Sequence, residues 1–205
     1  YLQDKHLLLI LDNFEQLVAA KGLLAEIIGR AAQLTLLVTS REVLHLREEQ
    51  IFPVAGLALP DAEGAGDLFQ ADAPQLFLNS ARRLQPDFGF YEGDRDALDR
   101  ICRLVEGMPL GILLAAAWAG TLTPAEIGDE IESSLDFLEA DWRDAPARQR
   151  SMRAVFDHSW CLLTEHERSV MGALTVFRGG FTRAAAQEVT GASLHTLMAL
   201  ANRSL

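Results

Sequence analysis

A carboxylate follows directly on an unbroken apolar run near the start of the chain. The run, Leu7–Leu11, leads into Asp12, which is followed by Asn13 and then, two positions on, by Glu15. A short, fully apolar run is typical of a strand buried on both faces of a parallel sheet, and such sheets bind ligands beyond the carboxyl ends of their strands. Hard cations prefer oxygen ligands, so Asp12 is a candidate ligand of Mg²⁺, through a water molecule. The alternative is that Asp12 only caps the helix that follows.

Three polar side chains follow a second apolar run. Leu34–Val38 leads into Thr39, Ser40 and Arg41. Residues 15–33 repeat apolar side chains at helical spacing, so we expect a right-handed strand–helix–strand crossover that brings both carboxyl ends to one sheet edge. Hydroxyls and a guanidinium there could contact the terminal phosphate of a nucleotide, since the planar fork of arginine matches phosphate oxygens. The alternative is that these residues only begin a surface loop.

The composition is that of a folded, acidic protein. Of the 205 residues 49% are hydrophobic and 23% are charged, and the formal net charge of −11 argues against a nonspecific binder of nucleic-acid backbones. Cys102 and Cys161 lack metal-ligand spacing and are predicted to be reduced core residues of a cytoplasmic protein. No apolar run is long enough to span a bilayer, and no signal peptide opens the chain. Because Tyr1 is not an initiator methionine, we expect an excerpt from a longer protein.

The middle of the chain is predicted to be helical, after one further short strand near Ile51 (QIFPV) and a connection rich in Ala, Gly and Asp. Asp94 is expected to cap the first of these helices. The predicted inward face of that helix comprises Leu98, Ile101, Cys102 and Val105. Gly107 and Pro109, in the sequence Gly-Met-Pro, are expected to end it and to start an apolar, central helix at Pro109.

The last part of the chain is predicted to contain a helix-turn-helix. Capping boxes that begin at Thr123 and Thr164 mark two helices. The glycine turn FRGGF then joins the second of them to a short helix that ends at Gly191, an arrangement typical of a winged-helix module. The short helix sets Arg183 against Glu188, which is a poor source of phosphate contacts. We therefore expect this module to pack internally, and the acidic balance argues against direct DNA binding.

The loop that cradles phosphates in many nucleotide-binding proteins is missing from these residues. That loop has the pattern G-x-x-x-x-G-K-[ST], and the sequence contains no Gly-Lys pair. Two interpretations remain open on the residues alone: the protein is not a nucleotide-hydrolysing protein of this kind, or the loop precedes the chain.

Four stretches in order resemble the signal-transduction ATPases with numerous domains, which are related to NB-ARC proteins, and in particular their branch in bacterial transcriptional regulators of the AfsR and LuxR type. The stretches are LLLILDNFEQL, LLVTSRE, GMPLGILLAAAW and RQRSMRAVFDHSWCLLTEHERSVMGALTVFRGGFTRAAAQEV. The resemblance implies an α/β part followed by an all-α part. It implies the C-terminal part of a P-loop NTPase domain in residues 1–60, a helical domain in residues 61–143, and a winged-helix-like domain, incomplete at its C-terminal end, in residues 144–205.

The resemblance also implies roles for single residues. The first stretch corresponds to Walker B, with Asp12 serving Mg²⁺, and the second to sensor 1, with Arg41 contacting the γ-phosphate. The third is the Gly-x-Pro motif, with Pro109 against the adenine, and the fourth is a winged helix that closes over the nucleotide. The family's phosphate-binding loop lies upstream of Walker B, which would place it before Tyr1. The implied nucleotide site comprises Asp12, Asn13, Thr39, Ser40, Arg41, Gly107 and Pro109.

The chain departs from the family pattern at two places. Asn13 stands where NB-ARC relatives usually carry a second acidic residue, and an amide cannot act as a general base. Glu15 is the nearby substitute and the candidate catalytic residue, so we expect a slow ATPase in the intact protein and no hydrolysis by this fragment alone. The family's histidine-containing ADP motif does not occur before Leu205, and His195 is expected to be structural or at the surface.

The predicted function is an ADP/ATP-dependent regulatory switch in a multidomain bacterial signalling or transcriptional regulator. The expected cofactors are Mg²⁺ and ATP or ADP, and the other expected partners are sensor and effector domains of the same protein, with self-association on activation. No membrane partner is expected. One alternative is a scaffold of the same fold that binds no nucleotide, for which Asn13 and the missing loop argue. The other is a regulator that binds DNA through its winged helix.

Overall fold

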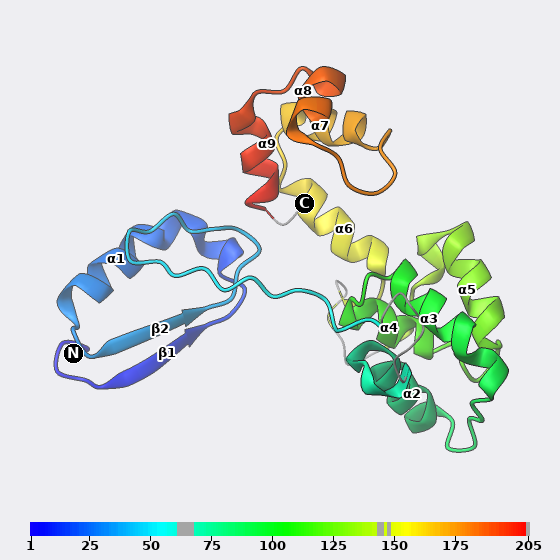
Figure 1. The fold of residues 1–205 in the computed structure, drawn as a ribbon. Helices are drawn as coiled ribbons and strands as arrows, with labels where there is room; N and C mark the ends of the chain where they lie inside the picture. Colours follow the sequence, from blue (N-terminus) through cyan, green and yellow to red (C-terminus); the bar gives the residue numbers. More distant parts are fainter. Residues whose placement is uncertain (61–67, 143–145, 147–148, 204–205) are drawn as a thin grey trace. The chain divides into compact units, whose positions relative to one another are not determined.

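The structure is a computed structural model that describes residues 1–60, 68–142, 146 and 149–203, without the side chain of His158. It divides into two compact units, one formed by Tyr1–Pro53 with Leu163–Leu205 and the other by Val54–Leu162 (Figure 1). The predicted domain boundaries at residues 60 and 143 fall at or within ranges that lie outside the described residues, and they stay predictions. No helix of the described ranges is long and apolar enough to cross a membrane.

The first unit contains a pair of parallel strands and two sets of helices. Its elements are β1 (Leu7–Leu11), the 3-10 helix η1 (Phe14–Ala20), α1 (Lys21–Arg30), β2 (Leu34–Val38), α7 (Glu165–Leu174), α8 (Arg183–Thr190) and α9 (Leu194–Ala201). The second unit is helical. Its elements are η2 (Leu68–Gln70), α2 (Asp72–Leu84), η3 (Glu92–Asp94), α3 (Arg95–Leu104), α4 (Pro109–Ala116), α5 (Pro124–Ser133), η4 (Leu135–Phe137) and α6 (Met152–Cys161). An α/β segment followed by helices is thus confirmed at this coarse level.

The two strands are parallel and span the residues that the apolar runs predicted. Their register pairs Leu7 with Leu34 and Leu11 with Val38, so both carboxyl ends reach the same edge. The crossover between them begins as a 3-10 helix and becomes α-helical only at Lys21, whereas the sequence predicts one helix from residue 15. A hydrogen bond of 3.0 Å from the amide of Phe14 to the carbonyl of Thr39 holds this first turn against the end of β2.

Only one face of the strand pair is covered by the described residues. Leu11, Leu36 and Val38 pack against a small core of Phe14, Leu24 and Leu44. The opposite face carries Leu8, Ile10 and Leu37, which are 55%, 59% and 52% exposed. The expectation of strands buried on both faces is therefore wrong for these residues, because a single crossover helix can cover only one side of the sheet (Figure 1).

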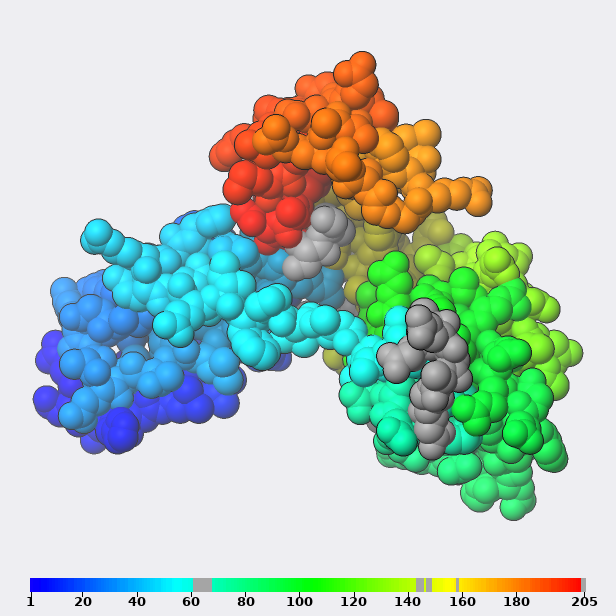
Figure 2. Space-filling view, in the orientation of Figure 1, coloured from blue at the N-terminus to red at the C-terminus, as the bar shows by residue number. Residues whose placement is uncertain are grey.

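The predicted third strand near Ile51 is also wrong. Residues 50–60, drawn in cyan in Figure 2, contain neither strand nor helix, and the apolar side chains of Ile51, Phe52 and Val54 are exposed. A β-rich composition produces a strand only where a neighbouring strand accepts its backbone hydrogen bonds. The described sheet contains β1 and β2 alone.

The second unit is built around α4, as its apolar sequence predicted. Gly111, Ile112, Leu114, Ala115 and Ala116 of this helix are all buried. Helices α2 and α3 contact α4, and α5 packs on α3. The predicted inward face of α3 is confirmed, since the side chains of Leu98, Ile101, Cys102 and Val105 are buried in the same core. Burial of each large apolar side chain stabilises the unit by roughly 1.5–3 kcal/mol.

Local sequence signals set most helix ends. Thr123 with Glu126 and Thr164 with Glu167 form the two predicted capping boxes. Asp94 precedes α3 as expected, but its carboxylate accepts a hydrogen bond from the amide of Tyr91 and makes no cap bond to α3. Pro109 occupies the first turn of α4, where its missing N–H costs nothing.

Candidate functional site

The carboxyl ends of β1 and β2 bring three of the predicted site residues together. The Thr39 hydroxyl donates a hydrogen bond to Oδ1 of Asp12 over 2.5 Å. The same hydroxyl oxygen accepts a hydrogen bond of 3.0 Å from the backbone amide of Asn13. The amide side chain of Asn13 donates to the other carboxylate oxygen of Asp12 over 3.1 Å. These three side chains therefore form one hydrogen-bonded group, which we call the strand-edge cluster.

The backbone holds the strand-edge cluster in place. The amide of Thr39 donates to the carbonyl of Leu11 over 3.0 Å, so the strand ladder continues to the point where Asp12 and Thr39 stand side by side. Asn13 then takes a left-handed conformation with φ of 57°, which asparagine tolerates better than most residues. The helix that follows has no side-chain cap bond from Asn13. The two described hydrogen bonds to the Asp12 carboxylate come from Thr39 and Asn13, and neither comes from a residue of the helix that follows.

The cluster leaves Asp12 free to bind more. A carboxylate offers about four lone-pair sites, and the two hydrogen bonds described here use only two of them. Asp12 is exposed to solvent. Among the described residues no three His, Cys, Asp or Glu side chains come together as a metal-binding group. One carboxylate suits a magnesium ion that keeps several waters and is held mainly by phosphate oxygens, rather than a metal held by the protein alone.

The other predicted site residues lie in different settings. Ser40 accepts a hydrogen bond of 3.1 Å from the amide of Glu42, which fixes the first turn beyond β2. Arg41, next along the chain, and Glu15, in the first turn of η1, are both half-buried. Gly107 and Pro109 belong to the second compact unit. Their predicted role at the adenine stays a prediction.

Gly107 has a structural role of its own. Its φ of +66° is left-handed, and its carbonyl accepts a hydrogen bond of 2.8 Å from the amide of Leu57. A Cβ atom added at Gly107 would lie 2.4 Å from the carbonyl oxygen of Leu57. The Gly-x-Pro motif therefore lets the extended segment before α2 lie directly against the turn between α3 and α4.

Comparison of the amino-acid sequence with curated proteins finds several relatives. The chain is 34% identical over 194 residues to "Putative HTH-type transcriptional regulator Rv0890c" of Mycobacterium tuberculosis and to "Putative HTH-type transcriptional regulator Mb0914c" of Mycobacterium bovis. Each match covers 94% of this chain and 21% of the relative. The chain is similar to regulators. It is also 32% identical over 189 residues to "Uncharacterized protein Rv0894" of Mycobacterium tuberculosis, covering 92% of this chain and 46% of that relative.

These matches extend along nearly the whole chain but not along the relatives. The chain spans about a fifth of the length of the regulators it matches. No family model matches the sequence. No solved structure matches it either. Similarity to transcriptional regulators is thus shown by relatives, whereas what the segment does within such a protein has to be argued from its own residues.

The predicted helix-turn-helix does not have the expected short turn between α7 and α8. Helices α7 and α8 are separated by residues 175–182, which is too long a connection for this motif. Helices α8 and α9 are joined by the short turn Gly191–Ser193, where Gly191 has a left-handed φ of 65° and Ser193 caps α9.

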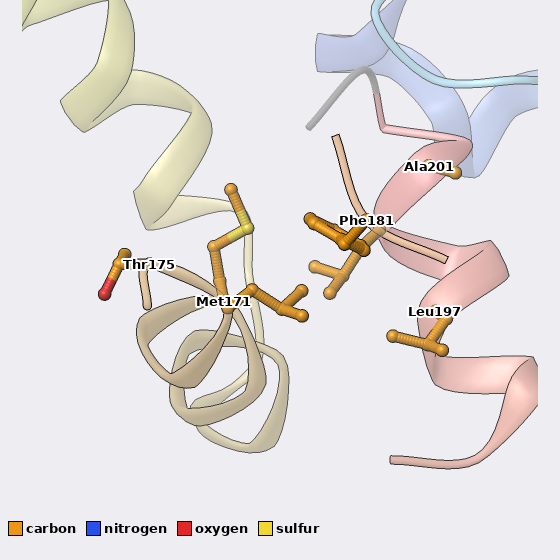
Figure 3. A pocket seen from close by; sticks show the side chains of 7 residues that line it. Met171, Thr175, Phe181, Leu197 and Ala201 are labelled. Carbon is orange, nitrogen blue, oxygen red and sulfur yellow. The ribbon is translucent and has the colours of Figure 1, made fainter. Parts of the chain in front are cut away.

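Helix α9 lacks the long basic side chains that bind phosphates and guanine bases. Its sequence LHTLMALA contains no arginine or lysine, and its exposed side chains include Leu194, His195 and Met198. A cavity of about 270 Å³ lies on its other side, between α7 and α9 (Figure 3). Its walls are apolar except for Thr175, whose hydroxyl donates to the carbonyl of Gly172 over 2.7 Å. Neither surface offers charge to a phosphate.

Sequence reasoning missed one group of charged residues in this unit. Arg203, just after α9, pairs with Glu167 at the start of α7 and with Glu42 in the loop after β2. Only Glu167 carried a sequence signal, as the last residue of a capping box. No local pattern links residues so far apart in the chain.

Proposed function

We propose that this chain is a regulatory segment of a transcriptional regulator and that it responds to a magnesium–adenine nucleotide bound beside the strand-edge cluster. The observation that carries the proposal is the Asp12–Thr39 hydrogen bond of 2.5 Å at the shared carboxyl edge of two parallel strands. This edge is where open α/β sheets bind ligands. The names of the relatives supply the regulatory context.

Each residue of the cluster has a defined task in the proposal. Asp12 accepts a hydrogen bond from a water of the magnesium shell, and Thr39 fixes the orientation of the Asp12 carboxylate. Arg41 follows on the same loop and contacts the terminal phosphate, so it distinguishes ATP from ADP. Because Asn13 cannot accept a proton, Glu15 is the carboxylate left to orient water, and turnover is slow. Slow turnover suits a switch, since each nucleotide state then persists.

The regulatory output follows from differential binding. A ligand shifts a conformational equilibrium only if it binds the two states with different affinity. In the proposal, ATP and ADP favour different positions of the loop after β2, and the change reaches other segments of the regulator or a second copy of it.

The test is nucleotide titration of the intact protein that carries this segment. Isothermal titration with Mg·ADP and Mg·ATP should show saturable binding that EDTA weakens. Asp12→Ala should weaken the magnesium-dependent affinity at least about tenfold, which corresponds to about 1.4 kcal/mol of lost binding free energy. Asp4→Ala is the matched control, because Asp4 is an exposed carboxylate that precedes β1 and lies outside the cluster.

Two results would decide against the proposal. Equal affinity of the Asp12→Ala and Asp4→Ala proteins for Mg·ADP would remove Asp12 from the site. No binding by the wild-type intact protein would favour the nucleotide-independent scaffold, in which the hydrogen bonds among Asp12, Asn13 and Thr39 serve only to close the sheet edge.

DNA binding is the second candidate function, because α8 and α9 are joined by a three-residue turn, which is the connection length of a helix-turn-helix. The lack of arginine and lysine on α9 argues against base or phosphate contacts from this helix. A salt-dependent mobility shift of duplex DNA by this chain would be needed to support that function.

A further inference from the structure

Arg203 joins two parts of the first unit that lie far apart in the sequence. Its Nη1 atom lies 2.6 Å from Oε2 of Glu167, and its Nε atom lies 3.2 Å from Oε1 of Glu42. The side chains of Arg203, Glu42 and Glu167 are 26%, 21% and 10% exposed. Beside them the amide of Val43 donates to the carbonyl of Asn202 over 3.2 Å. We call these contacts the Arg203 junction.

The junction satisfies groups that would otherwise be unpaired. The carbonyl of Asn202 lies at the C-terminal cap of α9, where carbonyl groups lack partners within the helix, and the amide of Val43 supplies one. The positive charge of Arg203 also lies at the C-terminal end of α9, which the helix dipole favours. Glu167 is held at the same time by the amide and hydroxyl of Thr164 over 2.8 Å each.

The charges make the junction dependent on one residue. Arg203 is the cation between the buried carboxylate of Glu167 and the half-buried carboxylate of Glu42. Burial raises the pKa of Glu167, but hydrogen bonds from Thr164 and Arg203 outweigh it and lower the pKa below its usual value. Glu167 is therefore charged at neutral pH. Removal of Arg203 leaves charged, partly desolvated carboxylates without their shared partner, which favours separation.

The junction also lies next to the strand-edge cluster along the chain. Glu42 and Val43 directly follow Ser40 and Arg41 in the sequence. The hydrogen bond of 3.1 Å from the Glu42 amide to the Ser40 hydroxyl restrains the backbone between them. A displacement of the loop at Ser40 and Arg41 therefore moves the Glu42 carboxylate and the Val43 amide, which hold the end of α9.

We propose that the Arg203 junction is a releasable contact that couples the loop after β2 to helices α7 and α9. When the contact is made, Glu42 and Val43 hold the end of α9 beside the start of α7. When the loop moves, the ion pair between Arg203 and Glu42 and the hydrogen bond between Val43 and Asn202 break together. The end of α9 is then no longer held by the loop. The existence of the contact does not depend on nucleotide; its control by nucleotide rests on the proposed function.

The first experiment measures amide hydrogen exchange of the chain without nucleotide. Arg203→Gln keeps a polar side chain, shortens it, and removes the positive charge that pairs with the two carboxylates. It should speed exchange about tenfold or more at residues 42–46 and 194–203, while exchange of β1 and β2 stays as in the wild type. Arg178→Gln is the matched control, since Arg178 is an exposed arginine of the same unit in the connection between α7 and α8.

A second, milder variant tests the proposal even if Arg203→Gln does not fold. Glu42→Gln removes only the ion pair between Arg203 and the loop and leaves the pair between Arg203 and Glu167. It should therefore speed amide exchange at Val43 more than in α7. The double variant Glu42→Gln with Arg203→Gln should exchange no faster than Arg203→Gln alone. Exchange in Arg203→Gln equal to that in Arg178→Gln, or strictly additive effects in the double variant, would overturn the proposal.

A second arm addresses control by nucleotide in the intact protein. Replacement of Mg·ADP by Mg·ATP should change exchange at residues 42–46 and 194–203 in the wild type but not in Arg203→Gln. If the wild type binds no nucleotide, the proposed function fails while the exchange result without nucleotide still decides on the junction. If nucleotide binds but these residues exchange equally in both complexes, the proposed control of the junction by nucleotide is refuted. The proposed nucleotide site is then unaffected.

Discussion

The two cysteines differ in burial and therefore in reactivity, although the sequence analysis assigns both to the core. Cys102 faces the core of the second unit with none of its surface exposed, whereas Cys161 at the end of α6 is exposed. The prediction that both are core residues is therefore wrong for Cys161. Burial, with a smaller contribution from Asp99, raises the pKa of the Cys102 thiol to about 12. Only the thiolate is a nucleophile, so Cys102 is inert in the folded protein.

We predict that thiol reagents distinguish the two cysteines. Native protein at pH 8 should react at Cys161 and not at Cys102, and Cys102 should remain unmodified up to about pH 10 because that is still well below its pKa. Labelling by Ellman's reagent followed by peptide mass spectrometry measures this. Both cysteines should react in guanidinium chloride, and Cys161→Ser should abolish the native reaction. Rapid native labelling of Cys102 would show that α3 is not packed as described.

At the scale of elements, close backbone contacts matter as much as apolar side chains. The segment before α2 is hydrogen-bonded to the turn between α3 and α4 through the Leu57 amide and the Gly107 carbonyl. It is also bound to α3, because the Arg103 side chain donates to the carbonyl of Pro60 over 2.7 Å. Gly56 comes equally close, since a Cβ there would lie 2.4 Å from the carbonyl oxygen of Glu106. Two glycines therefore allow one backbone to lie on another.

We predict that Gly107→Ala destabilises the protein by at least about 2 kcal/mol. The left-handed φ costs about 1–2 kcal/mol once the residue has a Cβ atom, and the clash with a backbone oxygen, which cannot rotate away as a side chain would, costs about 1–3 kcal/mol more. Urea unfolding followed by circular dichroism measures the loss. Gly93→Ala is the control in the same unit, because a Cβ there meets nothing within 4 Å and it should change stability by less than about 1 kcal/mol. Equal effects of the two substitutions would refute the close approach.

At the scale of the whole molecule, the two compact units have separate cores. The core of the second unit gathers Phe77, Leu98, Ile101 and Ile112, and that of the first strand pair gathers Phe14, Leu24 and Leu44. The first unit is assembled from both ends of the chain, as the Arg203 junction illustrates. A protein built in this way can loosen one core while the other stays folded.

We predict that damage to one core stays local. Ile112→Ala removes a fully buried side chain from α4 and should cost about 2–5 kcal/mol in the second unit. Hydrogen exchange should accelerate in α2, α3, α4 and α5 and remain unchanged in α7 and α9. Leu24→Ala is the matched change in the first unit and should leave exchange in α4 unchanged. Parallel acceleration in both units by either variant would mean that they unfold as one.

The sequence by itself determined what depends on neighbours along the chain. Both strands, the two capping boxes and the start of α4 at Pro109 lie where periodicity and helix-end chemistry predicted them, because these signals act within one or two turns. The meeting of Asp12 with Thr39 was predictable for a related reason, since a parallel crossover brings the two strand ends to one edge whatever else the fold contains.

Tertiary structure decided what depends on distant partners. The open face of Leu8 and Ile10, the exposure of Cys161 and the missing strand near Ile51 follow from which elements are present to cover or pair with them. The Arg203 junction likewise exists only because the fold brings Glu42, Glu167 and Arg203 together. A local pattern cannot encode such contacts, because burial and ion pairing are properties of the assembled surface rather than of the segment that carries the residue.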